Sequence, residues 1–221
     1  VWFQGFNDML QGGGEHYRAS EGRPQYALYT ELLAHFIRDV RKGFKTPKMP
    51  FVIGVIGIDG ENIKPDDRQA HLRKAMAAPA DMPAFRGNVT AVRTARFWDN
   101  KIGEIQHIKT ILKAPDKRYR RWAAYSELDP DGKYADRRAE FLKWYTPMKA
   151  QEPDRKKDRR AHRAWERKMK ADIDAHAYTP EELNYLKANH SNGGFHYMGS
   201  GKIYSRIGEA FARAILDMSG K

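Results

Sequence analysis

The stretch Phe51-Val52-Ile53-Gly54-Val55-Ile56-Gly57-Ile58 decides the fold class of this 221-residue chain. It contains no polar side chain, which is the pattern of a parallel strand that helices cover on both faces. A second such run follows at Val89 to Ala95. The sequence predicts a helix between them, at about Asp66 to Ala77, and this alternation of strand and helix indicates a parallel, doubly wound sheet.

Helical patterns flank these strands. From Tyr26 to Val40 one face of a helix is apolar, and further helices are predicted at Lys101 to Leu112 and at Ser200 to Met218. Val1 to Gly5 predicts a short strand that leads into a polar, Gly-rich loop from Gln11 to Pro24. The expected fold class is therefore α/β, with a three-layer α/β/α arrangement around a doubly wound parallel sheet.

Charge is distributed unevenly along the chain. There are 40 Lys and Arg residues against 28 Asp and Glu residues, and residues 155–170 alone hold nine of the basic and two of the acidic ones. Residues 113–188 are rich in both signs and contain Trp122, Trp144 and Trp165, which favours charged helices. We expect a single domain over residues 1–221, with residues 113–188 as a charged helical insertion.

Composition excludes several classes of site and protein. There are no cysteines, which rules out a disulfide framework, a thiolate metal site and a cysteine nucleophile. No apolar run is long enough to cross a membrane, and no signal peptide is visible. Because Val1 falls inside a predicted strand, we expect the sequence to begin within a longer gene product. Localisation, export included, and oligomeric state therefore stay open.

The segment Gln4-Gly5-Phe6-Asn7-Asp8 follows the first predicted strand, at the sheet edge where α/β proteins bind ligands. An Asn amide beside a Gly that leaves the backbone accessible can donate hydrogen bonds to the oxyanion that develops in acyl transfer. Since Gly, Asn and Asp all tolerate turn geometry, a plain turn is the alternative interpretation.

A second candidate segment, directly before the last predicted helix, is Gly193-Gly194-Phe195-His196-Tyr197-Met198-Gly199-Ser200. A His on a Gly-flanked loop can reach into a cleft as a general base, and a structural His in a tight loop is the alternative. Ser200 occupies the N-cap position of the predicted helix, which favours a cap over a nucleophile. A phosphate loop is rejected, because its first Gly would fall on His196.

These stretches together resemble the sialate O-acetylesterase-like branch of the SGNH hydrolases. The resemblance rests on VWFQGFNDM (1–9), ELLAHFIRDVRK (31–42), PFVIGVIGIDG (50–60), VTAVRTARFWD (89–99) and GGFHYMGSGKIYSRIGEAFARAIL (193–216). It covers the chain outside the charged insertion. It implies a serine esterase for O-acetylated carbohydrates, in which His196 is the general base, Asn7 donates to the oxyanion and Gly5 shapes the turn.

The chain departs from the pattern of that family in two ways. The nucleophilic Ser of the family belongs to an earlier sequence block, which implies an N-terminally truncated member that is inactive as given. The Asp that the family places three residues before the His is Gly193 here, and Asn192 is the nearest polar residue upstream. Because an Asn cannot stabilise an imidazolium as a carboxylate does, a non-catalytic carbohydrate-binding relative is the alternative function.

The remaining polar residues have weaker assignments. Gln4, Asp8 and Asp99 are candidate substrate-binding residues, with helix capping as the alternative for Asp99. We expect neither a cofactor nor a metal, because no paired metal-binding spacing connects the other histidines, which are His16, His35, His71, His107, His162, His176 and His190. The expected partner is an O-acetylated carbohydrate.

The basic run Arg155-Lys156-Lys157-Asp158-Arg159-Arg160, followed by His162, Arg163 and Trp165, has three interpretations. Strong nucleic-acid binders spread positive charge over a whole face, so a solvated helix face is favoured and no specific nucleic acid is expected. The third interpretation is an arm that holds acidic glycans, whose carboxylates and sulfates pair with Arg.

Overall fold

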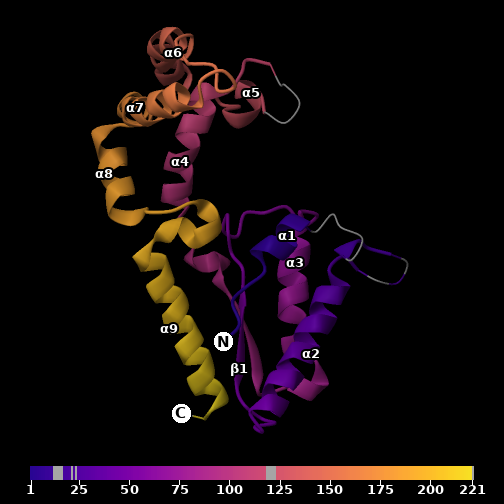
Figure 1. Cartoon of the computed structure of the whole chain (residues 1–221). Coiled ribbons are helices and arrows are strands. Elements are labelled where there is room, and N and C mark those ends of the chain that lie inside the picture. Colours follow the sequence, from indigo (N-terminus) through magenta and orange to yellow (C-terminus); the bar gives the residue numbers. More distant parts are fainter. Residues whose placement is uncertain (12–16, 21, 23, 118–122, 221) are drawn as a thin grey trace. The chain divides into compact units, whose positions relative to one another are not determined.

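The computed structural model describes residues 1–11, 17–20, 22, 24–117 and 123–220. These residues form two compact units, each described by itself (Figure 1). The sheet unit consists of Val1–Asn100 and Asn192–Lys221, and the helical unit of Lys101–Ser191. Half of the predicted loop from Gln11 to Pro24, with His16, and also Trp122 lie outside the described residues.

The described residues make a mixed α/β structure with more helix than strand. The sheet unit contains α1 (Phe6–Gln11), α2 (Ala27–Gly43), β1 (Phe51–Val55), α3 (Arg68–Ala77), β2 (Val89–Arg93) and α9 (Gly201–Met218). The helices that follow β2 are α4 (Asn100–Lys113), α5 (Tyr125–Leu128), α6 (Ala135–Lys149), α7 (Arg159–Ala177) and α8 (Pro180–Asn189). The four helices predicted outside the charged segment are confirmed as α2, α3, α4 and α9.

Two parallel strands form the sheet in the described part of the chain. β1 and β2 pair in register from Phe51 with Val89 to Val55 with Arg93. Where the sequence predicts a third strand, Trp2 alone pairs with β1: its N–H donates to the Val52 carbonyl at 2.8 Å and its carbonyl accepts from the Gly54 N–H at 2.7 Å. The pairing stops there because the chain turns into α1 at Phe6.

Helices cover both faces of this small sheet (Figure 1). The alternate side chains of Phe51, Ile53 and Val55 pack into a core with α2 and α3, whereas Val52 faces Val92 of β2 and Ala214 of α9. Gly54 permits close packing, because a Cβ atom there would lie 2.5 Å from Phe3 and 2.6 Å from Phe211. This double cover explains why β1 has no polar side chain.

The predicted strands and helix faces extend further than the observed ones. β1 ends at Val55 rather than Ile58, because the Gly57 N–H bonds to a side chain instead of a strand. On α2, Leu32 and Phe36 belong to the predicted apolar face, yet they are 54% and 37% exposed. The apolar stripe is wider than the surface that the two strands and their neighbours cover.

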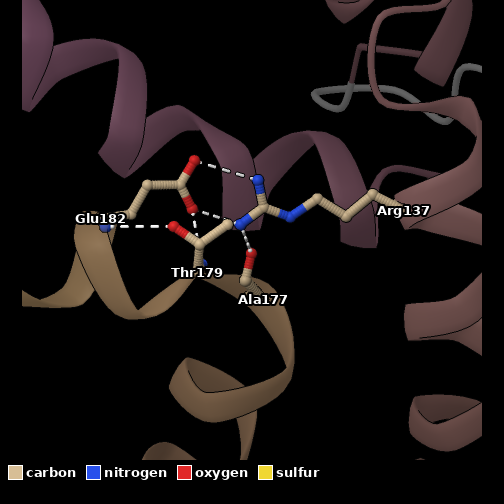
Figure 2. A network of polar contacts seen from close by, with 4 residues as sticks. All are labelled: Arg137, Ala177, Thr179 and Glu182. Atoms are coloured by element: carbon tan, nitrogen blue, oxygen red, sulfur yellow. Dashed lines mark hydrogen bonds and ion pairs between the residues drawn. The ribbon is translucent and has the colours of Figure 1, made fainter.

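The helical unit has a core of its own, in which Ile105, Ile108 and Leu112 of α4 pack with Phe141 of α6 and Tyr178. A network of polar contacts connects α6 to the start of α8 (Figure 2). The guanidinium of Arg137 on α6 donates to both carboxylate oxygens of Glu182 on α8 and to the Ala177 carbonyl. Thr179 and Glu182 form a reciprocal capping box at the start of α8.

The basic segment leads into α7. Asp158 is the N-cap of this helix, and its carboxylate accepts from the Ala161 N–H at 2.8 Å. The cationic side chains from Arg155 to Arg163 are all exposed, whereas His162 is buried against Glu152. Within the described part of the chain, no helix is long and apolar enough to cross a membrane.

Candidate functional site

A cleft of about 420 Å³ lies beyond the carboxyl ends of the strands in the sheet unit. The chain segment after Trp2, the residues after β1 and the loop before α9 all contribute to it. The walls are mostly apolar or aromatic and consist of Phe3, Gln4, Gly5, Phe6, Asn7, Ile56, Ile58, Phe195, His196, Tyr197 and Tyr204. Two segments from opposite ends of the sequence, around Asn7 and around His196, therefore line one cleft.

The loop from Gly193 to Ser200, called the His196 loop below, has an unusual backbone. Tyr197, Met198 and Gly199 have consecutive positive φ angles of 48°, 61° and 61°. Residues with a Cβ atom avoid this left-handed region, so contacts with the rest of the unit must hold the loop in place.

Tyr197 supplies the main contact between this loop and the sheet. Its buried phenolic oxygen accepts a hydrogen bond from the Gly57 N–H at 2.6 Å and lies 2.6 Å from Thr94 Oγ1. Because the Thr94 hydroxyl donates to the Val55 carbonyl at 2.7 Å, its oxygen is left to accept from the Tyr197 hydroxyl. The result is a directed chain of hydrogen bonds that fixes the residue after His196 to the ends of both strands.

Gly57 is required at the contact with Tyr197. A Cβ atom on Gly57 would lie 2.1 Å from the Ala95 nitrogen and 2.3 Å from its Cα. Burial raises the pKa of Tyr197, and its hydrogen bonds oppose that rise. The phenol therefore stays neutral and keeps the proton that it donates to Thr94.

The His196 side chain itself is exposed and lines the cleft. Its ring centroid lies 4.3 Å from that of Phe195, and the Tyr204 hydroxyl donates to the His196 carbonyl at 3.0 Å. The imidazole makes no hydrogen bond with any described residue. The backbone at this position is fixed, while both ring nitrogens stay available to a ligand.

In the N-terminal segment of the cleft, Gly5 is buried and Asn7 is exposed. A Cβ atom on Gly5 would meet Met76 at 3.3 Å and the Tyr29 hydroxyl at 3.5 Å, so this backbone packs closely against α2 and α3. Asn7 is the second residue of α1, and its side-chain amide has no hydrogen-bond partner within the described residues. An amide donor is therefore available beside the cleft.

Gln4 lines the cleft and also supports the segment, whereas Asp8 only supports the segment. The Gln4 amide donates to the Asp8 carboxylate at 2.9 Å, and the Tyr17 hydroxyl donates to the other carboxylate oxygen at 2.6 Å. Burial, followed by this bond to Asp8, raises the pKa of Tyr17. Gln4 is also held through its carbonyl, which accepts from Tyr29 at 2.9 Å. Asp8 is not among the residues that line the cleft.

Asp99, the third candidate for substrate binding, lies outside the cleft as well. Its side chain is 11% exposed, and its carboxylate pairs with Lys202 Nζ at 3.5 Å. Asp99 directly precedes α4 and Lys202 belongs to the first turn of α9, so the pair connects the start of α4 to the helix that follows the His196 loop.

The cleft thus combines an amide donor with an imidazole, but two parts of a serine-hydrolase site are not in it. No described carboxylate contacts His196, and none of the described serines lines the cleft. Ser200 is buried, its Oγ has no hydrogen-bond partner among the described residues, and it does not line the cleft. Among the described residues, no group of three side chains could hold a metal ion.

Comparisons with known proteins add no relative. No family profile, no curated protein and no solved structure matches the chain.

Three residues of this region have no assignment from the sequence alone. Tyr197 and Thr94 anchor the His196 loop, and Tyr204 bonds to its backbone. The only sequence feature that could have singled out Tyr197 is its position directly after His196. Its long-range contact with Gly57 depends on how the unit folds, and sequence patterns do not contain that information.

Proposed function

We propose that the cleft is the oxyanion and general-base side of a serine esterase site that removes acetyl groups from carbohydrates. The observation that carries the proposal is that Asn7 and His196, far apart in sequence and without hydrogen-bond partners among the described residues, line the same cleft. Acyl transfer needs both a donor for the oxyanion and a base for the nucleophile's proton. The resemblance to SGNH hydrolases assigns these roles to the same two residues.

In this proposal each part of the cleft has one role. The amide of Asn7 donates to the oxyanion, Gly5 shapes the turn that presents it, and His196 takes the proton of a serine nucleophile and returns it to the leaving hydroxyl. The serine comes from a segment outside residues 1–221. The aromatic walls, which include Phe6, Phe195 and Tyr204, suit the apolar face of a sugar ring. The fold that belongs to this proposal is a three-layer α/β/α arrangement around a complete doubly wound sheet, in which β1 and β2 lie in the middle layer.

A non-catalytic carbohydrate-binding protein is the second candidate. It is favoured by Gly193, which stands where the resemblance implies an Asp, and by the absence of any described carboxylate at the His196 imidazole. A His without such a partner is a weaker base. In that case the cleft binds the acetylated sugar without turnover.

The deciding experiment measures acetate release from O-acetylated glycans by the full gene product. We expect His196→Ala to lower the rate about 10²- to 10⁴-fold and Asn7→Ala about 10²- to 10³-fold. The control variants are His35→Ala and Asn62→Ala, two exposed residues of the sheet unit that do not line the cleft, and they should keep the full rate. Unchanged rates in the two cleft variants would exclude the assignment. Binding of the acetylated sugar without acetate release by the wild type would favour the second candidate.

A further inference from the structure

A second cavity, of about 540 Å³, lies inside the helical unit between α4, α6 and α7. We call it the lysine cavity, because four of its wall residues are Lys109, Lys113, Lys149 and Lys170. Its floor includes the buried Met169 and the half-buried Ile173. Trp165, the aromatic residue of the basic segment, also contributes to the wall, so this segment supplies part of a concave site as well as an exposed helix face.

The charges in this cavity are not balanced pair by pair. Lys109 Nζ bonds to the Asp174 carboxylate at 2.8 Å, and Lys149 pairs with Glu152. Lys113 is half-buried and forms no ion pair with any described residue. Its burial, and then its neighbours Lys109 and Lys149, lower its pKa. Asp174 opposes this shift, but its carboxylate forms its ion pair with Lys109. Among the described residues Lys113 therefore has no ion-pair partner of its own, and a bound anion would supply one.

Two aromatic rings border the same ammonium groups. Lys113 Nζ lies 5.2 Å from the ring centroid of Tyr145, and Lys149 Nζ lies 5.6 Å from that of Trp165. The indole N–H of Trp165 is buried and has no acceptor within the described part of the chain. Aromatic faces beside cationic groups suit a ligand that has both a C–H face and an anionic substituent.

We propose that the lysine cavity binds an acidic sugar, with the carboxylate of a uronic acid at Lys113 and the sugar ring against Tyr145 and Trp165. The sugar class rests on the proposed function of the sheet unit, whereas the anion follows from the lysines themselves. A nucleic acid fits less well, because Glu152, Glu166 and Asp174 also border the cavity and would repel successive phosphates. A single anion can approach Lys113 while these carboxylates keep their own partners or stay in solvent.

The test is a titration of the 221-residue chain with glucuronate, followed by NMR of the indole N–H groups. Glucose supplies the ring without the charge, and acetate supplies the carboxylate without the ring. We expect glucuronate to shift the resonance of Trp165, assigned from Trp165→Phe, and to bind at least about 10-fold more tightly than either fragment, since each fragment loses one set of contacts worth about 1.4 kcal/mol or more.

Variants of Lys113 separate this site from general attraction to a basic protein. Lys113→Met should weaken glucuronate binding at least about 10-fold, and Lys113→Arg should retain most of it. The matched control is Lys143→Met, an exposed lysine of α6 outside the cavity, which should bind as the wild type does. Equal losses in Lys143→Met and Lys113→Met, or acetate binding as tight as glucuronate binding, would overturn the proposal.

The measurement is independent of the esterase assignment. Glucuronate binding is read in the helical unit without any turnover, and acetate release is read at the cleft of the sheet unit. If the His196 and Asn7 variants keep full activity but glucuronate binds at Lys113, the esterase proposal alone fails. If glucuronate does not bind and the two cleft variants lose activity, the lysine cavity proposal alone fails.

Discussion

Replacing Tyr197 by Phe tests the anchor of the His196 loop, because it removes one oxygen atom and keeps the buried ring. That oxygen accepts from the Gly57 N–H and donates to Thr94 Oγ1, both at 2.6 Å. A buried N–H that loses its acceptor costs about 1–3 kcal/mol, and the lost bond to Thr94 adds about 1 kcal/mol. We therefore expect the free energy of unfolding of the sheet unit to fall by about 2–4 kcal/mol.

Amide hydrogen exchange of Gly57 is the most direct assay, read together with denaturant unfolding. In the wild type this amide should exchange slowly. In Tyr197→Phe it should exchange about 30-fold faster or more, because a loss of ~2 kcal/mol in the free energy of local opening corresponds to that factor. Tyr204→Phe is the matched control. The Tyr204 side chain bonds to the exposed His196 backbone and is itself 44% exposed, so its removal should leave Gly57 exchange unchanged. If Gly57 exchanges equally slowly in Tyr197→Phe and the wild type, the hydrogen-bond chain does not hold the loop.

Four further variants give separate checks. Gly57→Ala should destabilise the chain severely, since its Cβ would lie 2.1 Å from the Ala95 nitrogen. Gly208 lies in α9, where a Cβ would meet no described atom of another segment within 4 Å, so Gly208→Ala should stabilise the chain by about 0.5–1 kcal/mol in thermal unfolding. Lys113→Met should raise the melting temperature at neutral pH, because the lowered pKa of Lys113 means that its charge opposes folding. The gain in melting temperature should shrink as the pH approaches the unfolded-state pKa of Lys, about 10.4. No gain at pH 7 would contradict this reasoning. Burial raises the pKa of Glu182, but hydrogen bonds from Arg137 and Thr179 outweigh it and lower that pKa. The stabilisation from this pair is therefore present above the unfolded-state pKa of Glu, about 4.3, and is lost as the pH falls below it, so Arg137→Met should destabilise most at neutral pH and least at pH 3 in urea unfolding.

Periodicity was sufficient to predict most of the secondary structure of the sheet unit. The apolar run at Phe51 and the stripe that begins at Tyr26 are local signals, and both elements are found where they were expected. Strand lengths were overestimated, because a strand ends where its pairing partner ends. The first predicted strand, Val1 to Gly5, pairs with β1 only through the Trp2 bridge, and no local sequence pattern contains this information.

The sequence was sufficient to name the two segments of the candidate site, but not the contacts that their side chains make. Gly5, Asn7 and His196 could be singled out because their residue types suit acyl transfer, and they do line one cleft. The roles of Asp8 and Asp99 were harder to anticipate, because a carboxylate next to a cleft serves equally well as a structural partner. In the structure Asp8 bonds to Tyr17, and Asp99 pairs with Lys202. Side-chain pairing of this kind depends on distances that only the folded chain sets.

The split of the sheet unit between the two ends of the sequence determines the order in which the unit can be completed on the ribosome. β1 and β2 can pair as soon as Arg93 has emerged, but α9, which packs on Val52 and Val92, follows the helical unit of roughly 90 residues. At synthesis rates of about 5–20 residues per second, one face of the nascent sheet waits roughly 5–20 s for its helix. During that interval the apolar face is open to chaperones and to other nascent chains, so the yield of folded protein in cells should depend on how quickly residues 101–191 are translated.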